Sequence, residues 1–392
     1  MAVVLTFGVV LLVAVLVSGL AHRSVLSTTV LFMAAGFALG STGVDVLNID
    51  VRQPIVGTFA VLALFSVLFT DALRIGAPDL ARAWRLPGRA LLIGMPLTFA
   101  MLAGLARVLV GLRWTEAFLL AAVLSPTDPV FAAAIVGREE IPSRLRHLLN
   151  VESGLNDGLA LPVVIVLVAS AGHRHVDVAH LLGELALGLA LGVAIPWAAI
   201  KLERGRWFGA TSEYEPLNAF AIGLVVLAAT SLTGANEFLA AFAAGVTVAT
   251  MSPAIRDSFR QFGELVAELL KLGAVLVFAA VVTFDMLRGV GLGGYAFVAA
   301  ALLVARPVGL ELSLVTSHLD WRERAAASWF GPKGFASVVY GLFVLESRTG
   351  RAEQLFALVA VSVTASIVAH SSSDVLIARW FVRAEQREPR DP

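Results

Sequence analysis

Long apolar stretches recur along the whole chain, and they constrain its fold more than any other feature. A helix needs about 20 largely apolar residues to cross the hydrocarbon core of a bilayer, which is roughly 30 Å thick. Divided at its charged residues, prolines and glycines, the sequence yields about thirteen such segments. They span 3–21, 25–42, 54–74, 90–111, 114–138, 145–172, 178–201, 216–234, 236–251, 262–284, 292–317, 322–346 and 353–379. The sequence therefore predicts an all-α polytopic membrane protein, a single transmembrane unit over 1–382 with a short cytoplasmic tail over 383–392.

Composition excludes several classes of protein. Of the 392 residues, 58% are hydrophobic and only 15% are charged, against about 25% charged in ordinary soluble domains. The 29 Lys and Arg are balanced by 29 Asp and Glu, so the chain lacks the basic excess of a nucleic-acid-binding protein. No cysteine is present, which excludes thiolate catalysis and zinc or iron–sulfur sites built on cysteine. We expect a protein that is not an enzyme and has no resident cofactor or nucleic-acid partner.

Lys and Arg are unevenly distributed between alternate loops. Nineteen fall in one set of loops and six in the other. The smaller set comprises Arg52, Arg113, Arg174, Arg288, Arg348 and Arg351. Because cytoplasmic loops carry the excess of Lys and Arg, the N-terminus is predicted outside the cell and the C-terminus in the cytoplasm. The stretch 3–21 lacks a preceding basic region, so it is expected to be a first spanning helix of a multi-pass protein of the cell membrane, and not a removed signal peptide.

The predicted span 114–138 contains the interruption Ser125-Pro126-Thr127-Asp128-Pro129. Two prolines three positions apart remove two backbone donors and disfavour a helical conformation in the residue before each of them. The helix should therefore break near Thr127 and Asp128, which frees carbonyl oxygens such as that of Thr127. A plain proline kink would not explain a carboxylate at its centre, because an ionisable group inside a span costs at least about 2.5–3.5 kcal/mol.

The predicted span 145–172 carries the polar cluster Glu152-Ser153-Gly154-Leu155-Asn156-Asp157. On a helix, Ser153, Asn156 and Asp157 share one face, whereas Glu152 points away from Asp157. Asp157 and Ser153 thus present two oxygens one turn apart, a suitable half-site for a small hard cation. Glu152 needs a cationic partner from another helix, and we interpret it as one half of a buried structural ion pair.

Two cationic side chains lie at mid-span in the C-terminal third. Arg306 lies in the span 292–317 and is the expected partner of Glu152. Gly331-Pro332-Lys333-Gly334 interrupts the span 322–346, seven spans after the first interruption, so the two broken helices should run in opposite directions. Paired interruptions in two halves are typical of inverted-repeat transporters, whose ion site lies near the bilayer midplane.

These motifs resemble the monovalent cation:proton antiporters of the NhaP and sodium–proton exchanger type, over essentially the whole chain. The Asn-Asp pair after Glu-Ser is specific, because related electrogenic antiporters have Asp-Asp there. The resemblance implies an NhaA-like antiporter fold of thirteen helices with inverted repeats and two broken crossing helices. It also implies a homodimer, with core ion-transport helices at about 90–172 and 292–379 and the remaining helices forming a dimerisation domain.

The resemblance further implies roles for individual residues. Asp157 matches the carboxylate that binds either the cation or the proton, and Asp128, Ser153 and the Thr127 carbonyl match the other Na⁺ ligands. Asp71 matches an acidic residue that is usually Glu, and its shorter side chain favours contact with the ion through water.

Four residues match the supports of such a site. Asn156 and Thr127 match residues that hold the crossed backbone, and Glu152 with Arg306 matches a stabilising ion pair. Lys333 lies where the family more often has Arg, so it keeps the charge but lacks the planar fork of a guanidinium.

The expected function is exchange of Na⁺ or Li⁺ for H⁺ by alternating access at one site. Because one carboxylate stands beside Asn156 instead of two, electroneutral one-for-one exchange is the simpler expectation. K⁺/H⁺ exchange stays open, because hard oxygen ligands alone do not fix the size of the cavity. A cation channel would need repeated pore-lining groups, and an intramembrane aspartyl protease would need a Gly-rich setting around its aspartates, so both are disfavoured.

Overall fold

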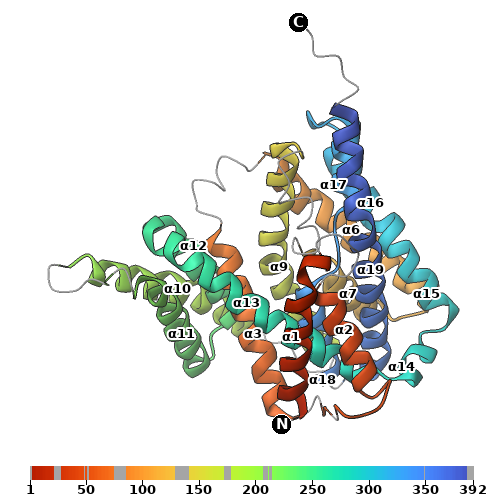
Figure 1. The fold of residues 1–392 in the computed structure, drawn as a ribbon, viewed down its shortest axis with the longest axis horizontal. Coiled ribbons are helices and arrows are strands. Elements are labelled where there is room, and N and C mark those ends of the chain that lie inside the picture. Colours follow the sequence, from red (N-terminus) through yellow and green to blue (C-terminus); the bar gives the residue numbers. More distant parts are fainter. Residues whose placement is uncertain are drawn as a thin grey trace, which may run out of the picture.

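The computed structural model describes residues 2–21, 28–47, 49–50, 53–74, 85–128, 141–171, 178–205, 211, 214–347 and 349–385. Every regular element in these ranges is helical, as the sequence predicts (Figure 1). The chain begins with α1 (Ala2–Ala21) at one end of the molecule, and the last helix, α19 (Ala352–Glu385), ends at the opposite end (Figure 1).

The other described helices are distributed along the whole chain. The first half of the chain forms α2 (Thr28–Leu39), α3 (Pro54–Leu73), α5 (Arg85–Arg89), α6 (Met95–Leu105), α7 (Trp114–Leu124), α9 (Ser143–Ala171) and α10 (Val178–Glu203). The second half forms α11 (Glu215–Thr233), α12 (Glu237–Met251), α13 (Pro253–Val281), α14 (Phe284–Gly289), α15 (Gly291–Ala300), α16 (Arg306–Leu314), α17 (Trp321–Trp329) and α18 (Phe335–Glu346). The π-helical stretch η1 (Ala90–Gly94) joins α5 to α6, and η4 (Ala301–Ala305) joins α15 to α16, in each case into a longer rod. A third, η2 (Ala106–Val110), continues α6 to its end before Gly111.

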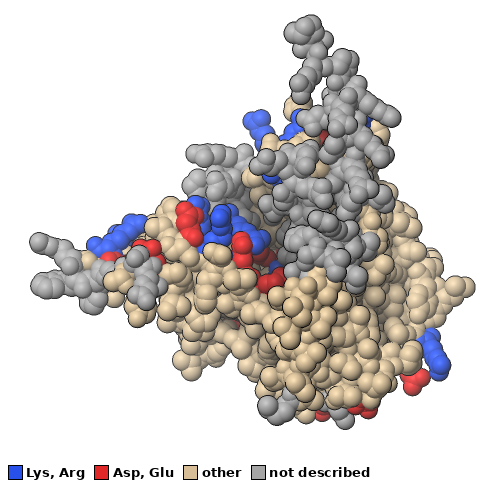
Figure 2. Space-filling view, viewed as in Figure 1, with Lys and Arg blue, Asp and Glu red and all other residues tan. Residues whose placement is uncertain are grey.

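Seven helical stretches of the described residues are long and apolar enough to cross a membrane. They are Ile55–Leu73, Arg85–Val110, Ser143–Ala171, Ala179–Glu203, Glu215–Thr233, Gly291–Leu314 and Ala352–His370. Five shorter apolar helices accompany them. Among these, α7 precedes the first predicted interruption and α18 follows the second. Most of the described surface in view in Figure 2 is uncharged; its largest group of charged side chains lies near the middle of the view, and smaller groups lie at the edges. A wide uncharged surface is what contact with lipid requires.

Three helix boundaries differ from the predicted spans by more than a few residues. The fourth helical rod begins at Arg85 instead of 90, α13 begins at Pro253 instead of 262, and α19 ends at Glu385 instead of 379, within the predicted tail. In each case the additional turns carry polar side chains, because a helix can continue into water once its backbone is paired. Apolarity alone therefore underestimates helix length. The predicted second half of the span 114–138, after Asp128, lies outside the described residues.

α18 lies in the centre of the molecule and positions the site. Residues 335–342 of this helix are all buried, and they pack against α3, α7, α9, α13 and α19. A helix that is apolar on all sides is expected at the centre of a bundle. The few polar groups on α18 therefore face other helices instead of lipid.

Candidate functional site

Two non-helical segments meet at the N-terminus of α18. The first, residues 125–128, follows α7, and the second, residues 330–334, separates α17 from α18. The backbone N–H of Asp128 donates to the Pro332 carbonyl over 2.9 Å, and the N–H of Phe335 donates to Oδ2 of Asp128 over 3.0 Å. Asp128 thus accepts a hydrogen bond from the first turn of α18, where the helix dipole favours a negative charge.

Two glycines allow this close approach. A Cβ atom on Gly334 would overlap the side chain of Asp128, and one on Gly331 would overlap the guanidinium of Arg306. Both glycines of the motif Gly331-Pro332-Lys333-Gly334 are therefore needed at the crossing point, because a side chain at either position would overlap neighbouring atoms. They permit two backbone segments to cross where a larger residue would force them apart.

Replacing Gly334 by Ala should lower the transport rate at least about tenfold, because the methyl group must displace the carboxylate of Asp128. Gly104→Ala in α6 is the matched control, since a Cβ there meets no atom within 4 Å, and it should keep the rate within about twofold. Initial exchange rates in proteoliposomes, normalised to reconstituted protein, make the comparison. Equal rates in the two variants would contradict the close packing at Gly334.

The polar face of α9 contacts the first of these segments. Asn156 donates from Nδ2 to Oγ1 of Thr127 over 2.7 Å, and Oγ of Ser153 lies 3.3 Å from the same hydroxyl oxygen. Ser153 and Asn156 therefore share one face of α9, as the helical spacing predicts, and both contact Thr127. All three side chains are buried. These contacts hold α9 against the break, so that Asp157 one position further lies beside it.

Asp157 is 6% exposed and Asp128 is 5% exposed, and their negative charges act on each other. Within the described part of the chain, Oδ1 of Asp157 and Oδ1 of Asn156 are buried oxygens without a hydrogen-bond partner. Buried acceptors are nearly always satisfied, so two neighbouring unsatisfied ones need an explanation. A bound proton or a small hard cation would satisfy them.

Asp71 lies at the end of α3, and the structure pairs it with an arginine. Nη1 of Arg74 lies 3.3 Å from Oδ1 of Asp71, and Nη2 of Arg74 lies 3.1 Å from Oε1 of Glu264. The charge of Asp71 still acts on Asp157. Asp71 therefore contributes to the electrostatic environment of Asp157, and it forms an ion pair with Arg74.

The ion pair predicted between Glu152 and Arg306 is present in the structure. Nη1 and Nη2 of Arg306 lie 2.8 Å and 3.1 Å from the two carboxylate oxygens of Glu152, and both side chains are buried. Arg306 also donates to the carbonyl of Phe330 over 3.3 Å. This pair joins α9, α16 and the second interruption.

Lys333 lies in the second interruption and is 1% exposed. Its backbone N–H donates to Oγ of Ser366 in α19 over 2.7 Å. Its Nζ makes no hydrogen bond with any residue that the structure describes. Lys333 therefore lies near Arg306 and Glu152 without forming a fork-like contact with either.

Two polar residues of α18 near the site were not predicted from the sequence. The Tyr340 hydroxyl donates to the backbone carbonyl of Asp157 over 2.9 Å, and Oγ of Ser337 donates to the carbonyl of Val123 over 2.7 Å. Their spacing of three positions on an otherwise apolar helix was the available signal. These bonds tie α18 to α9 and α7, one on each side of the crossing point.

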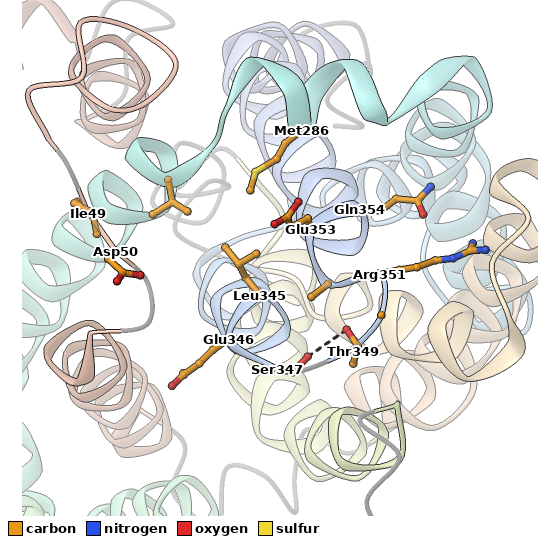
Figure 3. A pocket seen from close by; sticks show the side chains of 13 residues that line it. Ile49, Asp50, Met286, Leu345, Glu346, Ser347, Thr349, Arg351, Glu353 and Gln354 are labelled. Carbon is orange, nitrogen blue, oxygen red and sulfur yellow. Dashed lines mark hydrogen bonds between the residues drawn. The ribbon is translucent and has the colours of Figure 1, made fainter.

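Cavities approach the bundle from opposite ends of α3. One of about 320 Å³ lies at the C-terminal end of α3 and is lined by Asp71, Glu268 and Lys271, among others. Another, of about 1260 Å³, lies near Asp50, which precedes α3. Figure 3 shows its lining side chains, which include Glu346 at the end of α18 and Glu353 at the start of α19.

No group of three or more His, Cys, Asp or Glu within the described ranges could hold a metal ion.

A multi-pass helical protein with two interrupted segments crossing at buried carboxylates has the architecture of an ion-coupled secondary transporter. The sequence matches the family model of the transmembrane sodium/hydrogen exchangers over residues 9–379. The chain therefore belongs to the sodium/hydrogen exchanger family, and its resemblance to the NhaP type is confirmed.

Relatives support the same assignment. The K(+)/H(+) antiporter NhaP2 of Shewanella sp. (strain MR-4) is 24% identical over 379 residues, which cover 94% of this chain and 65% of that protein. The K(+)/H(+) antiporter NhaP of Alkalimonas amylolytica is 26% identical over 385 residues, covering 96% and 66%. The chain thus spans slightly less than two thirds of the length of these relatives.

A solved structure has the same fold. The sodium proton antiporter MjNhaP1 from Methanocaldococcus jannaschii at pH 8 superimposes with a TM-score of 0.79, and the match covers 100% of both chains at 16% identity. At that identity the match establishes the fold alone. It confirms the predicted all-helical antiporter fold.

Proposed function

We propose that this protein exchanges Na⁺ for H⁺ across the cell membrane by alternating access, with Asp157 as the shared binding group. The observation that carries the proposal is that Oδ1 of Asp157 and Oδ1 of the preceding Asn156 are both buried without a hydrogen-bond partner among the described residues. Asp128, Ser153 and the carbonyl of Thr127 complete the oxygen ligands of the cation, and Asp71 contacts it through water. Carboxylate, hydroxyl and carbonyl oxygens are the donors that hard cations prefer.

One-for-one exchange follows from competition at Asp157. Burial disfavours an isolated carboxylate charge, so Asp157 is neutralised either by a proton or by a cation. In both cases the occupied site carries the same net charge, and the exchange is electroneutral. The Glu152–Arg306 pair is neutral as a unit and stabilises the site without taking part in the exchange.

The proposed architecture has thirteen spans in two inverted repeats. Its support is that the two interruptions, near Asp128 and near Lys333, recur at positions five and twelve among the predicted spans. The fourth and eleventh spans, also seven apart, both contain π-helical stretches. Residues of about 90–172 and 292–379 form the moving core, and the other helices form the dimerisation domain of a homodimer.

The orientation places the N-terminus outside and the C-terminus in the cytoplasm. The asymmetry of Lys and Arg between alternate loops supports it. In this orientation the cavity beside Asp71 opens toward the cytoplasm, and the cavity beside Glu346 opens to the outside. A protein of this kind would export Na⁺ and import H⁺, and so contribute to pH homeostasis.

Neutralising the outer cavity should weaken cation capture from that side. With Glu346→Gln and Glu353→Gln combined, we expect the KM for external Na⁺ to rise about two- to fivefold at low ionic strength, because Asp50, Glu346 and Glu353 outnumber Arg351 in the lining and a cleft of net negative charge concentrates cations. Vmax should stay the same. In about 0.5 M choline chloride the difference should largely vanish through screening. An unchanged KM at low ionic strength would contradict the role of this cavity.

One assay tests the proposed function as a whole. Proteoliposomes containing a quenched pH-sensitive dye are given Na⁺, Li⁺ or K⁺, with and without a potassium ionophore that clamps the membrane potential. The proposal predicts dequenching on addition of Na⁺ whose rate does not depend on the clamp. Dequenching by no cation would refute antiport, and a dependence on the clamp would refute one-for-one exchange.

K⁺/H⁺ exchange by the same mechanism is the second candidate. The observation in its favour is that both curated relatives named above are K(+)/H(+) antiporters. In the dye assay it predicts that K⁺ drives proton movement at lower concentration than Na⁺.

A further inference from the structure

Lys271 is an ionisable residue in the predicted span 262–284 that the exchange mechanism above does not use. It lies in α13, is 9% exposed, and lines the cavity of about 320 Å³. Glu264 and Glu268, seven and three positions earlier, line the same cavity and share its face of the helix. A cationic group at this depth is costly, so its retention requires compensation by negative charge.

Compensation comes from several carboxylates at once. Asp128, Asp71 and Glu268 attract the ammonium group of Lys271, and Lys271 in turn attracts Asp157. Within the described residues, however, Lys271 has no ion-pair partner within 4.0 Å. An ammonium group on a flexible four-carbon stem, shared among several acids, can shift between them at little cost.

The groups around Lys271 come from two sides. Asp128 and Asp157 belong to the proposed core, whereas Lys271 lies on α13 and Asp71 on α3, both in the proposed dimerisation domain. The other charged groups that face Lys271 are Glu264 and Glu268 on its own helix and Arg74 on α3. Arg74 already pairs with Asp71 and Glu264. Lys271 is therefore a buried cation of the proposed dimerisation domain that shares a cavity with Asp71 and whose charge acts on Asp128 and Asp157 of the proposed core.

We propose that Lys271 is a tethered competitor of the transported ions: its ammonium group partly neutralises Asp128 and Asp157 when the site holds neither cation nor proton, and an arriving ion must displace that interaction. This inference rests on the proposed function of the same site. Competition by Lys271 lowers the affinity of the site for both Na⁺ and H⁺. It also reduces the repulsion between the carboxylates when the site is empty.

The competition has a definite signature. Removal of the positive charge strengthens binding of Na⁺ and of H⁺ by a similar factor, because both are attracted by the same carboxylates. At alkaline pH, where protons no longer compete, the KM for Na⁺ should fall roughly three- to tenfold. At acidic pH the two gains cancel and KM should change little. The pH below which protons inhibit exchange should move upward.

The chain contains no cysteine, which permits a matched test of charge at one position. Lys271→Cys introduces a single thiol into the cavity, so that aminoethyl methanethiosulfonate restores an ammonium group while methyl methanethiosulfonate adds a neutral one. The KM for Na⁺ is measured at alkaline and acidic pH in proteoliposomes. We expect KM at alkaline pH to fall roughly three- to tenfold in Lys271→Cys, to return to the wild-type value with the charged reagent, and to stay low with the neutral one.

Two further variants keep the test decisive. Lys271→Arg retains the charge and should keep the wild-type KM, whereas Lys271→Gln should behave like the unmodified cysteine variant. A KM at alkaline pH that is unchanged in Lys271→Cys and Lys271→Gln would overturn the proposal, as would equal effects of the two reagents. Absence of exchange in the wild-type protein would instead refute the proposed function itself.

Discussion

Asp157→Asn will abolish cation-driven proton movement in proteoliposomes, to the level of liposomes without protein. The amide keeps the shape of the side chain but cannot bind a proton, and it removes the negative charge that attracts the cation. Both half-reactions depend on this one group, so the loss should be at least about 100-fold. The rate of dye dequenching on addition of Na⁺ measures it.

Asp285→Asn is a suitable control for that loss. Its side chain is 95% exposed in α14, far from any buried carboxylate, and this variant should exchange at the wild-type rate. The exchange rate of Asp128→Asn should lie between those of Asp157→Asn and Asp285→Asn. The amide oxygen can still accept the hydrogen bond from Phe335, but the side chain carries no charge. Exchange by the Asp157→Asn variant above one tenth of the wild-type rate would mean that another group carries the proton.

Glu152→Gln will destabilise the folded protein more than any other single change at the site. The variant leaves the guanidinium of Arg306 buried beside a neutral amide, and an uncompensated buried charge costs about 3–5 kcal/mol. We expect a clear drop in the midpoint of thermal unfolding in detergent. The double variant Glu152→Gln with Arg306→Met removes both charges and should recover most of that stability.

An exposed ion pair provides the comparison. Arg256→Gln breaks the contact of Nε with Oδ1 of Asp257 over 2.9 Å, where the aspartate is largely exposed, and should cost about 0–1 kcal/mol. If Glu152→Gln unfolds at the same temperature as Arg256→Gln, the buried pair does not stabilise the bundle. If the double variant is less stable than Glu152→Gln alone, the cost does not arise from an unpaired charge.

Much of the fold and part of the site could be predicted because prolines and charged groups carry a large free-energy cost inside a membrane span. Proline within a span removes backbone hydrogen bonds, so the breaks near Asp128 and Lys333 were visible in the sequence. Buried charges need partners, so Glu152 and Arg306 could be paired although they lie 154 positions apart. These predictions rest on energetic penalties that are independent of the details of packing.

Other features depend on the relative positions of helices, which a single sequence does not encode in a readable form. The bond from Tyr340 to the carbonyl of Asp157 requires α18 and α9 to lie in one register. The hydrogen bond between Phe335 and Asp128 requires two interruptions to cross within a few ångströms. The ion pair of Arg74 with Glu264 joins the end of α3 to α13 and depends on how these two helices pack.

The most direct test of a shared site is the pH dependence of the KM for Na⁺, measured in proteoliposomes with the membrane potential clamped. If proton and cation compete for Asp157, KM should rise about tenfold for each unit of pH below the titration of the site, while Vmax at saturating Na⁺ stays constant. A KM independent of pH, with Vmax falling instead, would show that the proton binds elsewhere and would contradict exchange at one carboxylate.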